Sequence, residues 1–377
     1  MACLTYLILA AFSAATAARE IVFPPSIPQV PFGALSNDPI SAFTEVPPAV
    51  AGLTTFANIP HVFCLADAAN EAVEKFDIAF LGAPFDTATT GRPGARFGPG
   101  GIRQGSRRIE PGGYSIYTGE NSFDSWAKVV DCGDAPLTFL DNTVALKQLD
   151  HAHKIISGRE TNSSVYRVPR IIVLGGDHTT TLSALRSTFN RWGPVSVIHF
   201  DSHIDTWDPE VLGGGLSHYA GVNHGTFLHI AHEEGLITNS SVHAGIRAPV
   251  IRKKGDVRND VRCGFDIIRA RDIDRIGADG IIRRIKERVA GNKVYISVDI
   301  DVLDPAFAPA TGTAEVGGWS TRELLTILDG LVGLEVVGAD VVEVAPIYDN
   351  PGETTLLAAA EVAHSLLTLM VKQPVKP

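Results

Sequence analysis

Three residues of the kind that bind metals follow an apolar stretch near the middle of the chain. In the segment VSVIHFDSHID, Asp201, His203 and Asp205 stand at alternate positions. Alternate side chains of an extended strand share a face, so all three would point into one space. Two ionised carboxylates that are buried together repel each other and lose their water. The spacing therefore predicts a site for a cation.

Two other segments supply residues of the same kind after an apolar run. Asp299 and Asp301 follow the run in YISVDIDVLDP, and His178 ends RIIVLGGDH. A lone histidine after a strand is more often structural than a ligand, and Asp304, before a proline, indicates that some of these acids only form turns. Two histidines and four aspartates together suit a pair of metals and are too many for one. The oxygen-rich set favours Mn²⁺, with Zn²⁺, Co²⁺ and Fe²⁺ as rivals.

The elements that must position these residues alternate between apolar strands and helices. About eight strand-like runs are separated by helical patterns. Helices are expected at residues 143–159, 179–192, 226–236, 278–290, 320–333 and 353–372. Strands that are nearly all apolar and alternate with helices predict an α/β fold with a parallel sheet covered on both faces. Ligands of such sheets bind beyond the carboxyl ends of the strands, where the aspartates and histidines lie.

Two local signals refine this prediction. Thr179 is a candidate N-cap for one helix, and Ser320 or Thr321 is a candidate cap for another, with Glu323 in its first turn. Residues 87–108, rich in glycine and arginine, are expected to form a loop beside the site. The loop contains neither a Gly-Lys-Ser/Thr nor a G-x-G-x-x-G motif, which argues against a phosphate-binding loop.

The composition of the 377 residues is that of a folded α/β protein. Hydrophobic residues make up 45% of the chain and charged residues 20%, which is enough apolar material for a sizeable core. The net charge of −10, without a basic run, argues against a nucleic-acid partner. It mildly favours a small cationic substrate, because an acidic surface attracts cations.

The N-terminal residues indicate secretion. Residues 1–17 contain an apolar run followed by Ala-Thr-Ala, which is typical of a signal peptide and too short for a membrane span, although the run is not preceded by Lys or Arg. Residues 18–60 are rich in proline and are expected to form an irregular arm, and 61–377 to form a single catalytic domain. The expected location is the secretory pathway or the exterior, with no membrane attachment of the mature form.

Sequons and cysteines bear on the same question. The sequons begin at Asn162 and Asn239, and such sites fit a secreted chain but also occur by chance. Without the leader, three of the four cysteines remain, so at most one intramolecular disulfide can form. Cys132 and Cys263 lie in strand-like runs and are interpreted as buried apolar cysteines.

Several motifs in order resemble the ureohydrolase family, which contains the arginases and agmatinases. They are GGDHTTTL, HFDSHIDTWDP, NHGTF, SVDIDVLDPAFAPATGT and DVVEVAP, and LGAPFDTATTGRPGARFGPGGIR is similar to the agmatinase branch. The resemblance covers residues 76–372. It implies an arginase-like three-layer α/β/α fold, two Mn²⁺ ions per subunit and hydrolysis of a guanidino group to urea. A guanidinium keeps its proton and reacts poorly with water, which explains the need for two metals that activate the water.

The resemblance also implies roles for single residues. It assigns His178, Asp201, Asp205 and Asp299 to one metal, and His203, Asp201, Asp299 and Asp301 to the other. Glu343 matches a carboxylate that binds the guanidinium, and His224 matches a histidine that transfers protons. His218 competes with His224 for that role, and Trp207 and the triple glycine at 213–215 are candidates for substrate contact.

The expected reaction is hydrolysis of agmatine to putrescine and urea. The segment SHYAGVNHGTF departs from the Ser-Gly-Asn-x-His-Gly loop of arginases, which favours a substrate without an amino-acid head group. A guanidinobutyrase, acting on 4-guanidinobutyrate, or another guanidino-acid hydrolase remains an alternative. A non-catalytic protein that binds metal or guanidinium is an alternative of another class, although His224 and Glu343 argue against it. The family also implies a homo-oligomer.

Overall fold

The computed structural model describes residues 52–66, 73–217 and 220–377. The predicted signal peptide, the Pro-rich arm up to residue 51 and His218 lie outside the described residues. The described end of the Pro-rich segment packs on the domain. There, Phe56 is fully buried and stacks on Phe80, with ring centroids 4.1 Å apart.

Eight strands form one sheet, and every pairing in it is parallel. The strands are β1 (Ile78–Ala83), β2 (Val129–Asp134), β3 (Arg170–Gly175), β4 (Ser196–Phe200), β5 (Ser241–Ile246), β6 (Phe265–Arg269), β7 (Lys293–Asp299) and β8 (Glu335–Val342). Their order across the sheet is β2-β1-β3-β8-β7-β4-β5-β6. All residues of β1, β3, β4 and β5 are buried, as apolar strands covered on both faces should be. The predicted parallel α/β fold is confirmed.

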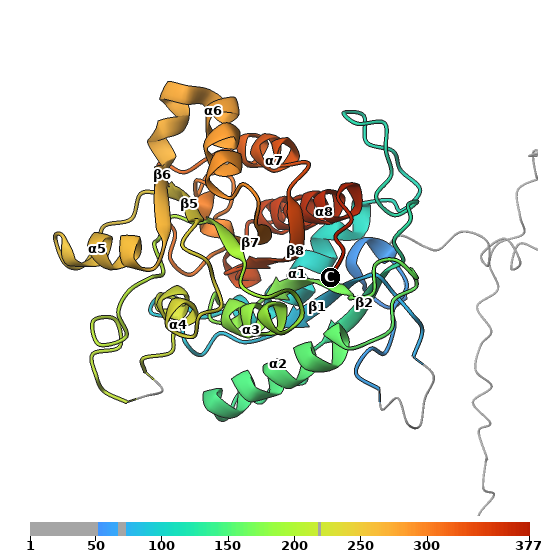
Figure 1. The fold of residues 1–377 in the computed structure, drawn as a ribbon, viewed down its shortest axis with the longest axis horizontal. Helices are drawn as coiled ribbons and strands as arrows, with labels where there is room; N and C mark the ends of the chain where they lie inside the picture. Colours follow the sequence, from blue (N-terminus) through green and yellow to red (C-terminus); the bar gives the residue numbers. More distant parts are fainter. Residues whose placement is uncertain (1–51, 67–72, 218–219) are drawn as a thin grey trace, which may run out of the picture. The chain divides into compact units, whose positions relative to one another are not determined.

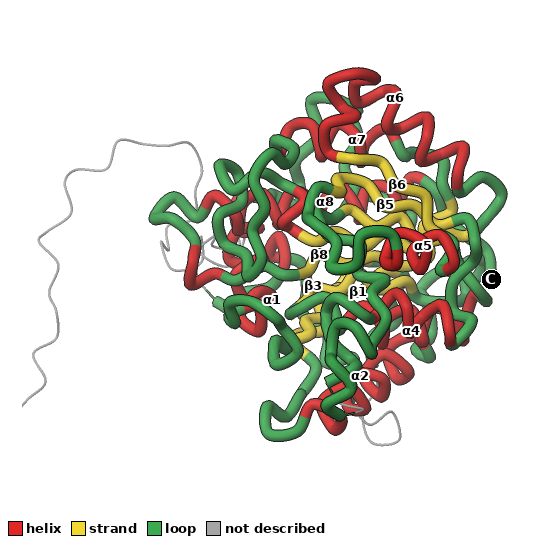
Figure 2. Tube along the Cα trace, turned by 90° about the vertical axis from the view of Figure 1, so that its left-hand side faces the viewer, coloured by secondary structure: helices red, strands yellow, loops and turns green. Residues whose placement is uncertain are grey.

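Eight helices cover the two faces of the sheet. They are α1 (Gly98–Gly105), α2 (Asn142–Ser157), α3 (Thr180–Trp192), α4 (Phe227–Glu233), α5 (Gly255–Arg262), α6 (Ile273–Arg288), α7 (Thr321–Gly330) and α8 (Thr354–Lys372). Helices α2, α3 and α4 pack in one row, and α1, α8, α7 and α6 pack in another (Figure 1). In Figure 2 the yellow sheet lies between α6 and α7 on one side and α2 and α4 on the other. The result is the three-layer arrangement.

Helix caps follow the sequence in one case and not in another. The Ser320 hydroxyl accepts a hydrogen bond from the backbone N–H of Glu323, and the Glu323 carboxylate accepts one from the backbone N–H of Ser320, so the predicted capping box is present. Thr179 precedes α3, but its side chain makes no capping hydrogen bond and its backbone is already helical. The predicted N-cap role of Thr179 is therefore wrong.

Helix α1 corrects the prediction of a continuous loop at 87–108. A Cβ at Gly98 would lie 2.6 Å from the carbonyl oxygen of Val344, and one at Gly105 would lie 2.3 Å from that of Leu356. The glycines therefore allow this helix to lie directly against its neighbours, a packing gain that outweighs their low helix propensity.

Helix α8 is long and apolar enough to cross a membrane by length and composition alone. Most of its most apolar window is buried inside the domain, and its buried residues include Leu366, Leu367 and Met370. It packs against α1, α7 and β8, as a core helix of a layered fold does.

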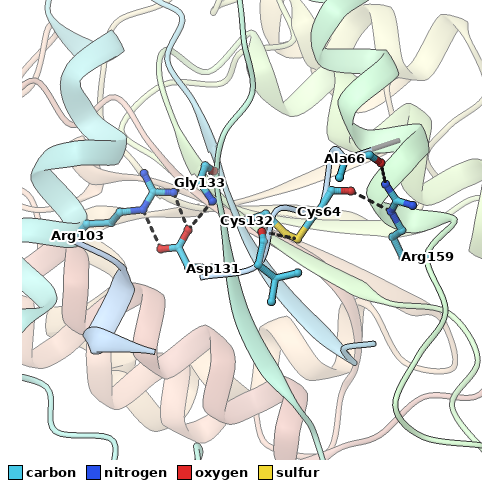
Figure 3. Close-up of a disulfide and its surroundings, with 8 residues drawn as sticks. Cys64, Ala66, Arg103, Asp131, Cys132, Gly133 and Arg159 are labelled. Carbon is cyan, nitrogen blue, oxygen red and sulfur yellow. Dashed lines mark hydrogen bonds and ion pairs between the residues drawn. A yellow bond between two sulfur atoms is a disulfide. The ribbon is translucent and has the colours of Figure 1, made fainter. Parts of the chain in front are cut away.

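A disulfide joins the segment before β1 to strand β2. Cys64 and Cys132 are bonded, which corrects the interpretation of Cys132 as a free apolar cysteine, whereas Cys263 is free and buried as expected. Arg159, which follows α2, donates from Nε to the carbonyl oxygen of Cys64 at 2.9 Å and from Nη2 to that of Ala66 (Figure 3). The pairing could not be read from the sequence because 68 residues separate the two cysteines.

A buried ion pair lies beside this disulfide (Figure 3). Asp131 is fully buried and accepts from Nε and Nη2 of Arg103 at 2.8 and 2.9 Å. Its two oxygens also accept from the backbone N–H groups of Phe56 and Gly133, each at 2.8 Å. Each carboxylate oxygen therefore receives two hydrogen bonds, which is its full capacity.

Candidate metal centre

Four neighbouring strands at the centre of the sheet bring the predicted site residues to one edge. His178 follows β3, Glu343 follows β8, Asp299 ends β7 and Asp201 follows β4. These strands are adjacent in the order β3-β8-β7-β4 and run in the same direction. Residues up to 165 positions apart in sequence therefore meet because parallel strands share a carboxyl end.

The first cluster surrounds the Nδ1 atom of His178. This nitrogen lies 3.2 Å from Oδ2 of Asp201, 3.1 Å from Oδ2 of Asp205 and 3.3 Å from Oδ2 of Asp299. One nitrogen can serve at most one of three carboxylates, and neither His178 Nδ1 nor Asp201 Oδ2 has a hydrogen-bond partner. A cation among these atoms would satisfy all of them.

The second cluster shares Asp201 with the first. Nδ1 of His203 lies 3.3 Å from Oδ1 of Asp201 and 3.1 Å from Oδ2 of Asp301. Asp299 accepts the backbone N–H of Asp301 through Oδ1 at 2.8 Å, which leaves its Oδ2 toward His178. The structure thus brings all six predicted ligands together in two adjoining groups that share Asp201, and Asp299 joins the first group through its contact with His178.

The electrostatics of the buried carboxylates of Asp299 and Asp301 also favour binding of a cation. Burial, followed by the charges of Asp301 and Asp201, raises the pKa of Asp299 well above its usual range. Burial and the charge of Asp201 likewise raise the pKa of Asp301. The ionised carboxylates are therefore unfavourable by themselves, and a divalent metal would supply the missing positive charge. The donor set fits such a metal.

A hydrogen-bonded chain behind His178 fixes its ring. Ser297 of β7 donates its hydroxyl to Oδ1 of Asp340 at 2.6 Å, so its oxygen must accept from Nε2 of His178 at 2.8 Å. Asp340 also accepts from Thr181 and Tyr295 through Oδ2. With the proton held on Nε2, the lone pair of Nδ1 faces the carboxylates and is available to a metal.

Glu343 and His224 form a pair beside the clusters. Nδ1 of His224 lies 2.9 Å from Oε1 of Glu343, which also accepts the backbone N–H of His178 at 2.9 Å. Burial lowers the pKa of His224, but the charge and hydrogen bond of Glu343 outweigh burial and raise the pKa to about 9. Thr90 holds the other side of the ring, with its N–H and hydroxyl 3.0 and 2.8 Å from Nε2.

Two site residues have left-handed backbone conformations that side chains other than glycine rarely adopt. Asp205 has a φ of 48° and Glu343 a φ of 61°. Such conformations are strained and persist only where the surrounding structure enforces them. The strained backbone directs the carboxylate of Asp205 toward His178 and that of Glu343 toward His224.

A cavity of about 200 Å³ opens onto the clusters. Its lining includes Trp207, Leu212, Thr90, His203, Asp205, His224, Asp299, Thr313 and Glu315. Trp207 lines this cavity, whereas Gly213 and Gly214 line an adjoining hollow together with Leu212. Glu315, which is partly exposed, has its Oε1 3.8 Å from Nε2 of His203.

Sequence reasoning missed residues that lie in or against the site. His199 is fully buried with Nε2 3.0 Å from Oδ2 of Asp201. The alternation that singled out Asp201, His203 and Asp205 extends back by two positions to His199, so the same signal could have found it. Asp177, beside His178, had no such signal, because its Oδ2 accepts the N–H of Ala88 from a distant loop.

Comparison with known proteins gives a consistent result. The profile described as "Arginase family" matches residues 76–368. "Putative agmatinase 1" of Schizosaccharomyces pombe is 52% identical over 343 residues, which cover 88% of this chain and 86% of the relative. The "Guanidinobutyrase" of Pseudomonas aeruginosa is 35% identical over 85% of this chain and 94% of its own length. The solved proclavaminate amidino hydrolase of Streptomyces clavuligerus superposes with a TM-score of 0.74 at 33% identity, covering 86% of this chain and 99% of that one.

Proposed function

Because the chain belongs to the arginase family, whose members are hydrolases acting on amidino groups, we propose that it hydrolyses agmatine to putrescine and urea. The relatives named for agmatine, guanidinobutyrate and proclavaminate hydrolysis narrow the substrate to a guanidino compound without choosing among them. The choice therefore depends on the cavity of this chain.

The charge of the cavity lining carries the proposal. Three carboxylates line it, from Asp205, Asp299 and Glu315, and no Lys or Arg is among its lining residues within 52–66, 73–217 and 220–377. Agmatine has a second positive charge at the end of its chain, whereas 4-guanidinobutyrate ends in a carboxylate. Glu315 would attract the amine of agmatine and repel the carboxylate of guanidinobutyrate. The substrate with the cationic tail is favoured.

The chain's own residues can orient the guanidinium and move a proton. Glu343 would accept N–H groups of the planar guanidinium, as charge-assisted hydrogen bonds favour. Hydrolysis adds water to the guanidinium carbon and breaks its bond to the alkyl nitrogen, which must leave as an amine. His224, whose pKa is raised to about 9, carries a proton at neutral pH and would give it to that nitrogen.

We further propose that the six ligands hold two Mn²⁺ ions. His178 and Asp205 would face one ion, His203 and Asp301 the other, and Asp201 and Asp299 both. The predominance of carboxylate oxygens favours a hard ion such as Mn²⁺. When bound, two such ions would act as Lewis acids that activate water near neutral pH. Removal with EDTA should abolish urea release, and Mn²⁺ should restore it better than Zn²⁺.

The test of the proposal is urea release from agmatine, 4-guanidinobutyrate and arginine by the purified Mn²⁺-loaded chain. Agmatine should be preferred, and Glu315→Gln should lower kcat/KM for agmatine about tenfold, corresponding to roughly 1.4 kcal/mol for one lost charge contact. Thr313→Ser, also in the lining, is the matched control and should keep the preference. A preference for guanidinobutyrate would reassign the substrate, and no urea from any of them would favour a non-catalytic binding protein.

We also propose that the chain enters the secretory pathway. The leader-like residues 1–17 support this, and so does the Cys64–Cys132 bond, because structural disulfides are rare in the reducing cytosol. Asn162 is exposed in the loop between α2 and β3, where a glycan would have room. In a eukaryotic host, glycosidase treatment should change the mobility of the secreted protein, and Asn162→Gln should remove that change. Retention in the cytosol with both cysteines reduced would refute this location.

A homo-oligomer remains the expected assembly. Tyr114, Ile116 and Tyr117 are among the most exposed large apolar side chains of the described residues and lie close together in the chain. Such a group of exposed apolar residues is a common feature of subunit contacts. Light scattering at micromolar concentration should give a mass above the 40.2 kDa of one chain, and a monomer would contradict the expectation.

A further inference from the structure

A line of buried polar side chains extends from the metal clusters toward helix α5. Nε2 of His199 lies 3.0 Å from Oδ2 of Asp201, and its Nδ1 lies 2.7 Å from Nδ1 of His243. On the other side of its ring, Nε2 of His243 lies 2.9 Å from Oδ1 of Asp260. Three consecutive contacts thus join a residue of α5 to the carboxylate that lies between the two clusters.

The sheet itself places the two imidazoles against each other. His199 of β4 and His243 of β5 are register partners in a parallel pair, so their side chains emerge on the same face. Phe265 of β6 stacks on His243, with ring centroids 4.1 Å apart and planes 11° apart. The stack holds the His243 ring in the orientation that directs one nitrogen at each neighbour.

The hydrogen-bond roles at the outer end are fixed. Thr206 donates its hydroxyl to Oδ1 of Asp260 at 2.6 Å, so this carboxylate acts as an acceptor, and Nε2 of His243 donates to it. At 2.7 Å the two Nδ1 atoms need a proton between them, because two lone pairs would repel. The remaining nitrogen of His199 then faces only Asp201.

Burying these polar side chains would cost folding free energy if they only packed the core. His199, His243, Asp260 and Thr206 are all fully buried, and no Lys or Arg is paired with Asp260 among the described residues. A buried carboxylate without a cationic side chain is unfavourable unless its contacts serve a purpose. Apolar residues of similar size would fill this space at lower cost.

From this geometry we infer that Asp260, His243 and His199 form a positioning network that fixes the carboxylate of Asp201 for binding metal. Asp201 belongs to both clusters, so a change in its orientation would weaken both metal positions together. His178 is supported by hydrogen bonds through Ser297 and Asp340, whereas the new network reaches Asp201 through the 3.0 Å contact of its Oδ2 with Nε2 of His199. Neither His243 nor Asp260 lines the cavity. His243 reaches Asp201 through His199, and Asp260 contacts both His243 and the hydroxyl of Thr206.

The test measures Mn²⁺ affinity by calorimetry, with no substrate present. His243→Phe keeps an aromatic ring on Phe265 but removes both hydrogen bonds, and should weaken Mn²⁺ binding about 10- to 100-fold, as loss of a supporting hydrogen bond typically does. His243→Gln keeps a polar group between His199 and Asp260 and should recover part of that loss. Asp260→Asn, which is nearly isosteric, should weaken binding in the same direction.

The control is His153→Phe. His153 is also fully buried, but neither of its ring nitrogens has a hydrogen-bond partner, so replacing it should leave Mn²⁺ affinity unchanged. Mn²⁺ affinity within twofold of wild type in both His243→Phe and Asp260→Asn would overturn the inference. Equal losses in His243→Phe and His243→Gln would also overturn it, because they would indicate packing alone. The inference rests on the proposed metal site, and a wrong substrate assignment would leave it standing because the titration uses no substrate.

Discussion

The disulfide-linked edge and the metal clusters both contain buried carboxylates, but the two places differ in how the chain compensates the charge. At the edge, Asp131 receives four hydrogen bonds, two of them from Arg103, and has no capacity left. In the clusters, Nδ1 of His178 faces three carboxylates, and Oδ2 of Asp201 has no hydrogen-bond partner. The two places do not differ in solvent exposure, since Asp131 and Asp201 are both fully buried.

The difference separates structural from functional burial of charge. A carboxylate that is saturated by its own chain stabilises one arrangement and can accept nothing more. A group of carboxylates that the chain leaves short of positive charge is stable only with an added cation. Substitutions at the edge should therefore change stability without changing chemistry, and substitutions in the clusters should do the reverse.

The largest effect is expected from Asp201→Asn. The loss of the shared ligand should lower urea release from agmatine on the order of 1,000-fold or more, about 4 kcal/mol of barrier, while the metal-free chain keeps its thermal midpoint. Metal analysis should find fewer than two ions per chain. Asp304→Asn is the control, because Asp304 only accepts backbone N–H groups of a turn, from Ala306, Gly317 and Gly318. Normal urea release by Asp201→Asn would contradict the distinction between the structural carboxylate at the disulfide-linked edge and the functional carboxylates of the clusters.

Arg103→Ala tests the other side of the comparison. It leaves Asp131 buried without its partner, which should cost about 3–5 kcal/mol of unfolding free energy. Denaturant unfolding measures this loss, and urea release per folded molecule should be unchanged. The exposed Arg322 provides a matched control, since Arg322→Ala should change stability by less than about 0.5 kcal/mol. A selective loss of activity in Arg103→Ala would show that the edge is coupled to the site.

The disulfide should contribute somewhat less than the ion pair. Replacing Cys64 and Cys132 by serine removes a link across 68 residues and should lower the unfolding free energy by about 2–4 kcal/mol. Reductant added to the wild-type protein should lower the thermal midpoint in the same way. KM and kcat for agmatine should remain those of the wild type, because the bond joins the edge strand β2 to the segment before β1, away from β4 and β7 in the interior of the sheet. Unchanged stability would mean that other contacts hold this segment.

The smallest of these effects concerns proton transfer by His224. His224→Gln should lower kcat about 100-fold, while Mn²⁺ affinity is retained. In the wild type the donor form is full at low pH and is lost as pH rises toward the pKa of about 9, so kcat should fall on the alkaline side. Bound metal cations disfavour the protonated form of His224 and would therefore move this fall of kcat to below pH 9. In His224→Gln, kcat should no longer fall on the alkaline side. If kcat of the variant depends on pH in the same way as kcat of the wild type, His224 is not the proton donor.

Much of the fold and of the site could be predicted because both follow from strand periodicity. Apolar runs gave eight strands, and the parallel arrangement put the residues after them at one edge, so His178, Asp201 and Asp299 were predicted to meet. Helix α5, GDVRNDVR, was not predicted, because it is short and has no apolar period. Its Asp260 nevertheless belongs to the network behind Asp201.

What could not be predicted depends on distances between segments. The bond between Cys64 and Cys132 requires their approach in space. Helix α1 forms from a glycine-rich segment because its packing partners, around Val344 and Leu356, come from the far end of the chain. Local propensity has no information about such partners.

The placement of the ligands after three strands has a consequence for how the protein matures. The ligands span residues 178 to 301, so the two spaces exist only after β3, β4 and β7 have all joined the sheet. A metal that binds only this completed arrangement stabilises the folded chain by mass action and raises its melting temperature with metal concentration. Metal supply would then set how much of the newly made protein survives, in addition to how fast each molecule works. The abundance of the protein and its activity would then both depend on the concentration of the same metal ion.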